Sequence, residues 1–230
     1  MKIQFFSLVF LVCSSALAAD NVMKDFDSLG GSSALMEKVK NIEPDKKLSI
    51  VQNRTVDRIQ RAEVAPEFFG VLGGDSYLNT AGYGIVGQYH FNPSVSLGAR
   101  YSKMSNQLST EGKNLIDESI ANGTNLVPDM DQPLNQALAF VNYYPVYGKL
   151  NLFNKAITQF DVYGSLGYGT INLKSGGKAT WTAGGGIGFW LSQHLTTRLE
   201  LLYQSYEAQR IQGSKAMNLT LANLQIGYLL

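Results

Sequence analysis

Cysteine, charge and long hydrophobic runs are all scarce in this chain of 230 residues. It contains one cysteine, and Lys and Arg number 19 against 18 for Asp and Glu, so 16% of the residues are charged and the formal net charge is +1. Ordinary soluble domains contain about 25% charged residues. The balanced charge gives no sign of the basic patch with which proteins bind nucleic acid. A mean hydropathy of -0.06 argues against a bundle of membrane helices, each of which needs about 20 consecutive apolar residues.

The beginning of the chain has the features of a secretory signal peptide. A basic start at Lys2 precedes the apolar run of residues 3–12, and residues 16–18 form an A-x-A cleavage site. We expect cleavage after residue 18, so that the mature chain is exported. Cys13 raises the alternative of a lipoprotein, but Val12 stands where such a signal needs a small residue. Ordinary cleavage removes the single cysteine, which excludes disulfides and thiol catalysis in the mature chain.

The composition changes sharply near residue 61. Residues 19–61 contain 15 charged residues in 43, whereas residues 62–230 contain 21 in 169. We therefore divide the chain into a signal peptide (1–18), a polar periplasmic segment (19–61) and one further domain (62–230). Within the polar segment, residues 33–42 are expected to form a short helix, and the amphipathic stretch that ends the segment is ambiguous between helix and strand. The segment is either a loose lead-in or a docking site for a periplasmic protein.

Bulky and small side chains alternate with a period of two throughout the domain. In residues 81–91, Tyr83 and Ile85 occupy odd positions, while Gly84 and Gln88 occupy even ones. A strand sends successive side chains to opposite faces, so each segment has one bulky apolar face and one small polar face. In a soluble sandwich the bulky face would form the core, whereas in a membrane barrel it would contact lipid and the polar face would fill the lumen. Export, the scarcity of charge on both faces and strands of about ten residues favour the membrane barrel.

Eight segments show this pattern, which predicts an all-β fold: an eight-stranded antiparallel transmembrane β-barrel preceded by a short polar, partly helical N-terminal segment. Such a barrel must close, because lipid cannot satisfy an open strand edge. The tight turns are expected on the periplasmic side and the longer connectors outside. The longer connectors span residues 74–77, 105–133, 172–177 and 207–216. The predicted strands span residues 62–73, 78–91, 94–104, 134–146, 157–170, 178–191, 194–206 and 217–230.

Short motifs in this part of the chain resemble a known family. Residues 145–154 read PVYGKLNLFN ahead of FDVY at 160–163, VQNR at 51–54 leads into the first strand, and YHF at 89–91 closes the second. Over residues 48–230 the chain is similar to the outer-membrane beta-barrel domain family of gliding and predatory Gram-negative bacteria. The resemblance implies a small barrel in the outer membrane and no catalytic residues.

Most charged residues of the predicted strands fall on inward faces. Unpaired charges are costly inside a dry-walled lumen, so we expect a structural network of ion pairs, with a proton or ion path as the alternative. Aromatic residues near strand ends are expected to form interfacial girdles. The network residues are Glu63, Glu67, Arg100, Asp161, Arg198 and Glu200. The interfacial aromatics are Tyr77, Tyr101, Tyr143, Tyr147, Tyr168 and Trp181. In the fourth strand, the residues expected to face outward are Ala137, Ala139, Val141 and Tyr143.

Two glycine motifs have a structural interpretation. Residues 82–87 match the G-x-G-x-x-G pattern of dinucleotide sites, but that mechanism needs a junction between a strand and a helix. Here the motif lies inside an alternating strand, so we interpret its glycines as small lumen-facing residues. The glycines of residues 184–188 are expected to leave room inside the barrel in the same way, opposite a bulky neighbour such as Trp190.

Enzymatic function is not expected. A lipid hydrolase or acyltransferase would need a base, usually a histidine, near a serine, and His90 and His194 both adjoin predicted periplasmic turns. The loop of residues 105–133 carries five acidic residues and one lysine, but Asp129 and Asp131 fall far short of a calcium loop. No catalytic, cofactor-binding or metal-binding residue is therefore predicted.

The leading hypothesis is a non-catalytic outer-membrane protein that acts as a structural or anchoring component of the cell envelope, alone or within a surface complex. The alternatives are a narrow porin-like channel for small solutes and an adhesin that acts through residues 105–133. The expected partners are outer-membrane lipids and lipopolysaccharide, the barrel-assembly machinery during insertion, and a periplasmic protein bound through residues 19–61. No cofactor and no nucleic acid is expected.

Overall fold

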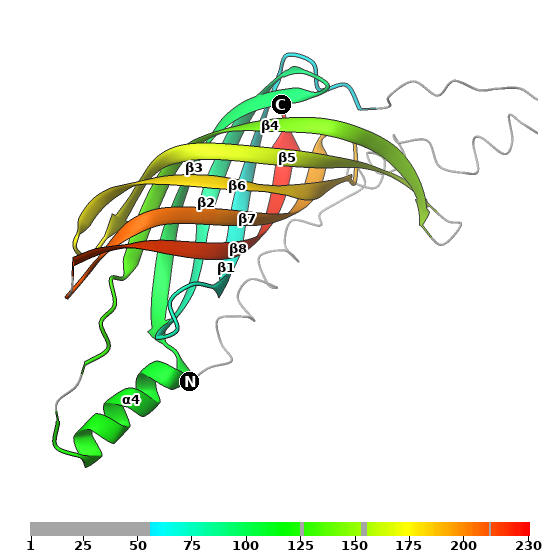
Figure 1. Cartoon of the computed structure of the whole chain (residues 1–230). Coiled ribbons are helices and arrows are strands. Elements are labelled where there is room, and N and C mark those ends of the chain that lie inside the picture. Colours follow the sequence, from blue (N-terminus) through cyan, green and yellow to red (C-terminus); the bar gives the residue numbers. More distant parts are fainter. Residues whose placement is uncertain (1–55, 125–126, 153–155, 212) are drawn as a thin grey trace, which may run out of the picture.

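The chain forms a closed antiparallel barrel of eight strands in the computed structural model, which describes residues 56–124, 127–152, 156–211 and 213–230. Each strand pairs with the next in sequence, and β1 closes the barrel against β8 (Figure 1). The predicted barrel is therefore confirmed, whereas the signal peptide and the predicted helix at 33–42 lie outside the described residues. The elements are β1 (Arg61–Gly73), β2 (Leu78–Asn92), β3 (Val95–Leu108), α4 (Thr110–Ala121), β4 (Pro133–Leu152), β5 (Ala156–Leu173), β6 (Gly176–Trp190), β7 (Leu195–Arg210) and β8 (Gly213–Leu229).

The two ends of the barrel differ. The turns after β2 and β6 lie at the same end as residues 56–60 and Leu230, and we call this the terminal end. The opposite end carries α4 and the turns after β1, β5 and β7, and we call it the α4 end (Figure 1). No helix in the described ranges has both the length and the hydropathy to cross a membrane.

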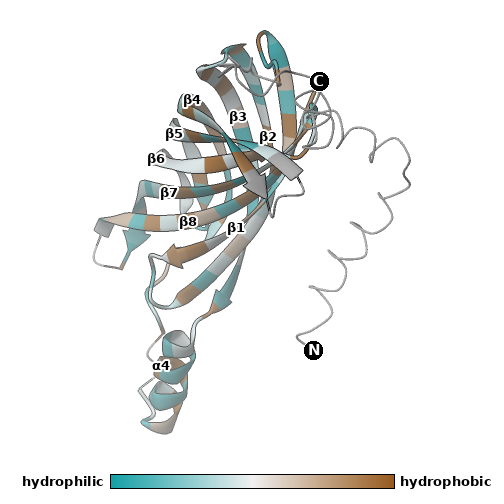
Figure 2. Ribbon diagram, turned by 90° about the vertical axis from the view of Figure 1, so that its right-hand side faces the viewer, coloured by the Kyte–Doolittle hydropathy of each residue, from teal (hydrophilic) through white to brown (hydrophobic). Residues whose placement is uncertain are grey.

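Side chains alternate between the outer and inner faces, as the period of two requires. In β7, Leu199 and Leu201 are 55% and 58% exposed, whereas Arg198 and Glu200, which alternate with them along the strand, are 2% and 3% exposed. Hydrophobic and hydrophilic residues accordingly alternate along the ribbons in Figure 2. The outward residues predicted for the fourth strand are all exposed in β4, namely Ala137, Ala139, Val141 and Tyr143. These exposed apolar side chains thus lie on the outside of the barrel, and a membrane would cover them there.

The aromatic residues predicted at the membrane interfaces fall into two groups. Tyr101, Tyr168 and Trp181 point outward and are 46–67% exposed, and Tyr143 is 58% exposed. Tyr168 and Trp181 are cross-strand partners on β5 and β6. Tyr77 instead lies in the turn after β1, and Tyr147 is half-buried and donates a hydrogen bond to Gln159. A girdle role remains a prediction for the four exposed residues and has no geometric support at the other two. The outer wall therefore carries Tyr101, Tyr143, Tyr168 and Trp181.

Strands are longer than the sequence indicated, which corrects two of the predicted connectors. The predicted connector 207–216 is mostly strand, because β7 and β8 stay paired without a register shift up to Arg210 and Gly213. The predicted connector 172–177 shrinks to the two residues between β5 and β6. At the terminal end, β4 and β5 also remain paired out to Leu152 and Ala156. Towards the α4 end the outward residues of these extensions, such as Glu207 and Gln209, are polar, while the inward Leu173 and Ala208 are apolar, so the bulky-outward pattern of the membrane wall is lost although the backbone ladder continues.

The predicted loop of residues 105–133 contains a helix, which is a second correction. β3 continues to Leu108, and α4 follows at once over Thr110–Ala121. The Ser109 side chain caps the helix by accepting a hydrogen bond from the Gly112 N–H at 3.0 Å, as serine does at helix N-termini. The helix projects from the barrel end (Figure 1). The serine cap was readable from the sequence, but the acidic, weakly amphipathic helix behind it was not.

Glycines on the inner face of β6 make room for a tyrosine of β5. Tyr163 is 3% exposed and pairs across strands with Gly186. A Cβ placed on Gly186 would lie 2.5 Å from the Leu199 carbonyl oxygen and 2.8 Å from the Tyr163 hydroxyl. Gly186 therefore accommodates the Tyr163 side chain, and Gly188 lies beside Asp161, whereas the bulky neighbour expected from the sequence was Trp190. The motif at 82–87 lies inside β2, but Gly87 faces open space and not the lumen.

Gly186→Ala is expected to destabilise the barrel by about 1–3 kcal/mol, because the added methyl group overpacks the wall against Tyr163. Urea titration of the protein folded in phospholipid vesicles measures the change. Gly87→Ala is the matched control, since nothing lies within 4 Å of the added Cβ and the expected change is within about 0.5 kcal/mol. Equal effects of the two substitutions would contradict this account of the β6 glycines.

Candidate functional site

The half of the lumen nearest the terminal end is built around one buried carboxylate, that of Glu63 on β1. Arg198 of β7 binds it with both terminal nitrogens, Nη1 to Oε1 at 2.5 Å and Nη2 to Oε2 at 2.8 Å. Thr196 donates to Oε1 at 2.8 Å, while the Gln88 amide and His90 Nε2 each lie 3.0 Å from Oε2. A buried charge is tolerated only when it is paired and hydrogen-bonded. The four side chains come from β2 and β7, so Glu63 of β1 links its neighbour β2 to β7.

A second cluster crosses the middle of the barrel. The Arg100 guanidinium of β3 lies 2.6 Å from Glu200 Oε2 through Nη2 and 3.1 Å from Glu67 Oε2 through Nε. Ser102 donates to Glu67 Oε1 at 2.5 Å, and Asn223 donates to Glu200 Oε2 at 2.9 Å. All these side chains are at most 5% exposed. One arginine of β3 therefore compensates two carboxylates on the far side of the lumen, one on β1 and one on β7, which β8 separates.

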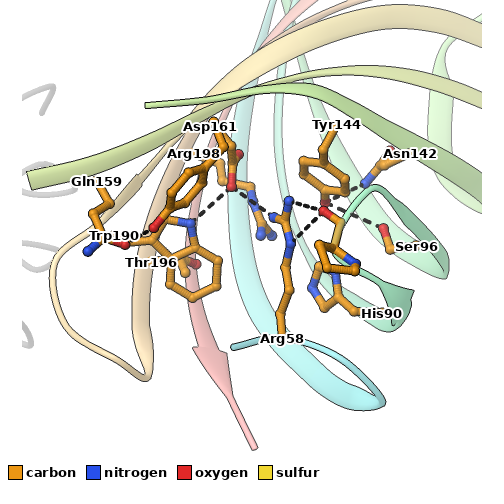
Figure 3. Close-up of polar contacts among 12 residues, drawn as sticks. Arg58, His90, Ser96, Asn142, Tyr144, Gln159, Asp161, Trp190, Thr196 and Arg198 are labelled. Atoms are coloured by element: carbon orange, nitrogen blue, oxygen red, sulfur yellow. Dashed lines mark hydrogen bonds and ion pairs between the residues drawn. The ribbon is translucent and has the colours of Figure 1, made fainter. Parts of the chain in front are cut away.

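A third cluster closes the terminal end and includes a residue that is not on a strand. Arg58 precedes β1, yet its side chain is 2% exposed and its Nη1 lies 2.9 Å from Asp161 Oδ2 (Figure 3). The guanidinium also donates to the Pro93 carbonyl through Nε at 3.0 Å and through Nη2, and it lies 4.0 Å from the Tyr144 ring centroid. Trp190 Nε1 donates to the same Asp161 oxygen at 2.9 Å. Arg58 thus closes the mouth of the lumen from within.

The sequence placed Arg58 in the polar segment and missed its role. A signal was present, because the six predicted network residues comprise four acids and only two arginines. A dry lumen does not tolerate that imbalance, so further cations were needed nearby. Arg58 pairs with Asp161, and His90 contacts Glu63. The period of two also continues through Val56 and Arg58, both of which are 2% exposed, so the boundary drawn at residue 61 cuts through the packed structure.

All six predicted network residues face the lumen. Glu63 and Arg198 pair with each other, and Glu67, Arg100 and Glu200 form the central cluster. Asp161 pairs with none of the other five, since its partner is Arg58.

The other half of the lumen, towards the α4 end, is apolar. Eight buried side chains from four strands pack there, including Phe69, which is 6% exposed. Buried amides also lie in this half: Gln204, which stands between Leu202 and Tyr206 on the inner face of β7, donates to Gln136 at 2.9 Å and to Thr180 at 3.0 Å. The apolar cluster comprises Phe69, Ile171, Leu173, Leu202, Tyr206, Ala208, Leu219 and Leu221. The barrel therefore has a hydrophobic core on one side of its midpoint and a charged core on the other.

Both histidines lie at the terminal end, beside the turns that follow β2 and β6. His90 is at the terminal end, but it is 0% exposed and points into the lumen towards Glu63. His194 adjoins the turn after β6, as expected, and its ring stacks on Tyr228 at a centroid distance of 5.8 Å. Among the described residues, no three His, Cys, Asp or Glu side chains are grouped closely enough to hold a metal ion. The acidic residues of the lumen are instead occupied by arginine and amide donors.

The closed eight-stranded barrel with a polar lumen and an apolar exterior agrees with one comparison with known families. The family model described as outer membrane protein beta-barrel domain matches residues 6–229. The chain belongs to this family. Membership places the barrel in the outer membrane, whereas the narrower likeness to proteins of gliding and predatory bacteria remains an expectation.

Solved structures similar to this outer-membrane barrel share low sequence identity with it. A structure described as de novo design of transmembrane beta-barrels is 14% identical, with a TM-score of 0.39, and 76% of this chain and 99% of that chain are covered. The N-terminal beta-barrel domain of Pseudomonas aeruginosa OprF is 12% identical, with a TM-score of 0.35 and coverages of 73% and 97%. AlkL in lipid bilayers is 10% identical, with a TM-score of 0.34 and coverages of 80% and 97%. No curated protein matches the chain.

Proposed function

We propose that this outer-membrane barrel is a non-catalytic structural or anchoring component of the cell envelope. The filled lumen carries the proposal. Buried ion pairs occupy the half nearest the terminal end, and the apolar cluster around Phe69 occupies the other half. Small barrels whose interior is filled by side chains leave no aqueous path. The packed apolar layer in particular would oppose the passage of ions and polar solutes.

The proposed orientation puts the terminal end in the periplasm and α4 outside the cell. Short turns face the periplasm and longer connections face outward in barrels of this kind. The turns after β2 and β6 at the terminal end are short, while the longest connection of the described chain, between β3 and β4, is at the α4 end. In this orientation the polar segment up to residue 61 lies in the periplasm, where it is available to a protein partner. Outer-membrane lipids and lipopolysaccharide would cover the apolar wall, and the barrel-assembly machinery would insert it.

Planar-bilayer recording tests the structural role against the channel. The mature chain, inserted from a preparation whose heat-modifiable migration on a gel shows that it is folded, is expected to give no discrete conductance steps above the baseline. A porin inserted under the same conditions supplies the positive control. Discrete steps that scale with the amount of folded protein would establish the channel and overturn the structural proposal.

The proposal also excludes lipid chemistry. Folded protein incubated with phospholipid and lipopolysaccharide is expected to release no fatty acid above the level of a heat-unfolded sample. Time-dependent release that disappears in a His90→Gln variant would instead assign a catalytic role to the lumen.

A further inference from the structure

One edge of the sheet at the α4 end lacks a neighbouring strand among the described residues. β1 pairs with β8 only as far as Gly73 and Thr220, whereas β8 begins at Gly213. The stretch Gly213–Leu219, which we call the open edge, is therefore paired with β7 alone. It is about 24 Å long at 3.4 Å per residue. Ser214, Lys215, Ala216 and Asn218 within it are exposed.

The direction of the unpaired backbone groups follows from the hydrogen bonds at the other end of β8. The Leu230 N–H donates to the Ala62 carbonyl oxygen of β1, whereas the Leu229 N–H donates to the His194 carbonyl oxygen on the β7 side. Backbone groups alternate in direction along a strand, and the pairing of β7 with β8 contains no register shift. Even-numbered residues of β8 therefore point away from β7. The N–H and C=O groups that face outward along the open edge are those of Ser214, Ala216 and Asn218.

The opposite edge of the same hairpin is capped by the chain itself. β6 pairs with β7 only as far as Thr180 and Tyr206. Beyond that point, the Gln209 N–H donates to Asp131 Oδ2 at 3.1 Å, and the Ile211 N–H donates to Asp129 Oδ2 at 3.0 Å. Two aspartates thus take the place of a neighbouring strand on β7. No comparable cap is found on the open edge of β8 within the described ranges.

A polar hollow lies directly beside the open edge. It has a volume of about 570 Å³ and lies between β8 and the turn after β1. Arg210 is held there by Asp75 Oδ2 at 2.5 Å and by the Asp129 carbonyl, so its charge is already compensated. Lys215 lines the hollow and is the one charged side chain of the open edge. Among the described residues, no acidic side chain forms an ion pair with Lys215, so its ammonium group is available to a ligand in the hollow.

We propose that the open edge of β8 binds an extended segment of another protein outside the cell by strand addition, with an acidic side chain of that segment facing Lys215. An exposed edge is a template for a further strand, and natural proteins usually blunt it with proline, charged side chains such as lysine, bulges or covering loops. The open edge contains neither proline nor a register shift, and Lys215 is its one charged residue. Main-chain hydrogen bonds supply the affinity in this mode of recognition, and side-chain contacts supply the specificity.

A synthetic peptide tests the proposal with the mature chain folded in phospholipid vesicles. The probe is an acetylated and amidated heptapeptide of alternating threonine and valine with a central glutamate, labelled for fluorescence anisotropy. Saturable binding is expected, together with slowed amide exchange at Ser214, Ala216 and Asn218 but not at Lys215 and Met217, whose N–H groups already face β7. Absence of saturable binding would overturn the proposal.

Two substitutions at one position separate edge binding from nonspecific adsorption. Ala216→Pro removes an outward N–H while leaving the β7 ladder intact, and it is expected to weaken binding at least about tenfold. Ala216→Val keeps that N–H and is expected to bind within about twofold of the parent. Retained slow exchange at Met217 shows that the hairpin of the proline variant is folded. Equal affinity of the two variants would overturn the assignment of the site.

Lys215→Gln tests the charged contact. It is expected to weaken binding several-fold and to remove most of the salt dependence, because exposed ion pairs are screened by salt. If Ser214, Ala216 and Asn218 are protected without peptide and the protein crosslinks to itself through β8, the occupant is a second copy of this chain and the proposal of a foreign strand is wrong.

Discussion

Arg100→Leu is expected to lower the free energy of unfolding of the barrel by about 3–5 kcal/mol, because the substitution leaves two buried carboxylates without their cation. Glu67 and Glu200 are 1% and 3% exposed, and both lie within 3.1 Å of the guanidinium. Ser102 and Asn223 would still donate to them, but neutral donors do not offset a buried negative charge. Urea titration in phospholipid vesicles and the temperature of heat-modifiable migration measure the loss.

Lys103→Leu is the matched control for Arg100→Leu. Lys103 is on the same strand, and its replacement removes the same charge. Its side chain is exposed on the outer wall. Its replacement is expected to be neutral or slightly stabilising. The triple variant Arg100→Leu, Glu67→Gln, Glu200→Gln is expected to recover part of the stability, because it removes the charges together. Conductance should stay at baseline in every variant. Unchanged stability of Arg100→Leu would show that the central cluster does not hold the barrel together.

Arg58→Ala is expected to have an effect of similar size, about 3–5 kcal/mol, although the residue precedes the first strand. The substitution leaves Asp161, which is 0% exposed, with Trp190 Nε1 as a donor but without a positive charge. It also removes the guanidinium from the Tyr144 ring, a buried contact of the cation–π type. The measurement is again urea titration in vesicles.

Arg61→Ala controls for the loss of a positive charge at the same end. Arg61 binds the Leu230 and Leu229 carbonyls at the rim and carries no buried ion pair, so its replacement is expected to cost less than about 1 kcal/mol. Methylguanidinium at low millimolar concentration is expected to restore part of the stability of Arg58→Ala, since its cradle of Asp161, Pro93 and Tyr144 would remain. The rescue ion stabilises the folded state by mass action. Equal losses in the two variants, without rescue, would mean that the Arg58 cradle contributes nothing specific.

The sequence predicted the barrel well because its evidence is local. Alternation between bulky and small residues follows directly from strand geometry, so strands such as β1 and β2 were found nearly at their observed positions. The strand extensions towards the α4 end were missed because the pattern changes there: outward residues such as Glu207 and Gln209 are polar, while the inward Ala208 is small and apolar. Helix α4 was missed because its apolar residues are few and the acidic composition of residues 105–133 suggested a solvated loop.

The inward positions of the charged residues could be predicted, but their pairing could not. Alternation places Glu63, Arg198 and Asp161 in the lumen, yet which of them meet depends on strand tilt and stagger, which no single strand encodes. Arg58 shows this most clearly, because its partner Asp161 is 103 residues away in the sequence. Alternation places Tyr163 on the same face as Asp161, but its packing against Gly186 depends on the register between β5 and β6.

The carboxylate of Glu63 has a consequence for how the barrel is made. Its arginine partner follows it by 135 residues, so the pair can form only after the first and seventh strands have met. Contacts this remote along a chain form late in folding. A partly assembled sheet would contain the Glu63 carboxylate on its first strand without its arginine partner. Only the closed barrel brings Arg198 to that carboxylate. Closing the circle and satisfying this charge are therefore one event, which penalises partly assembled forms and makes formation of the barrel all-or-none.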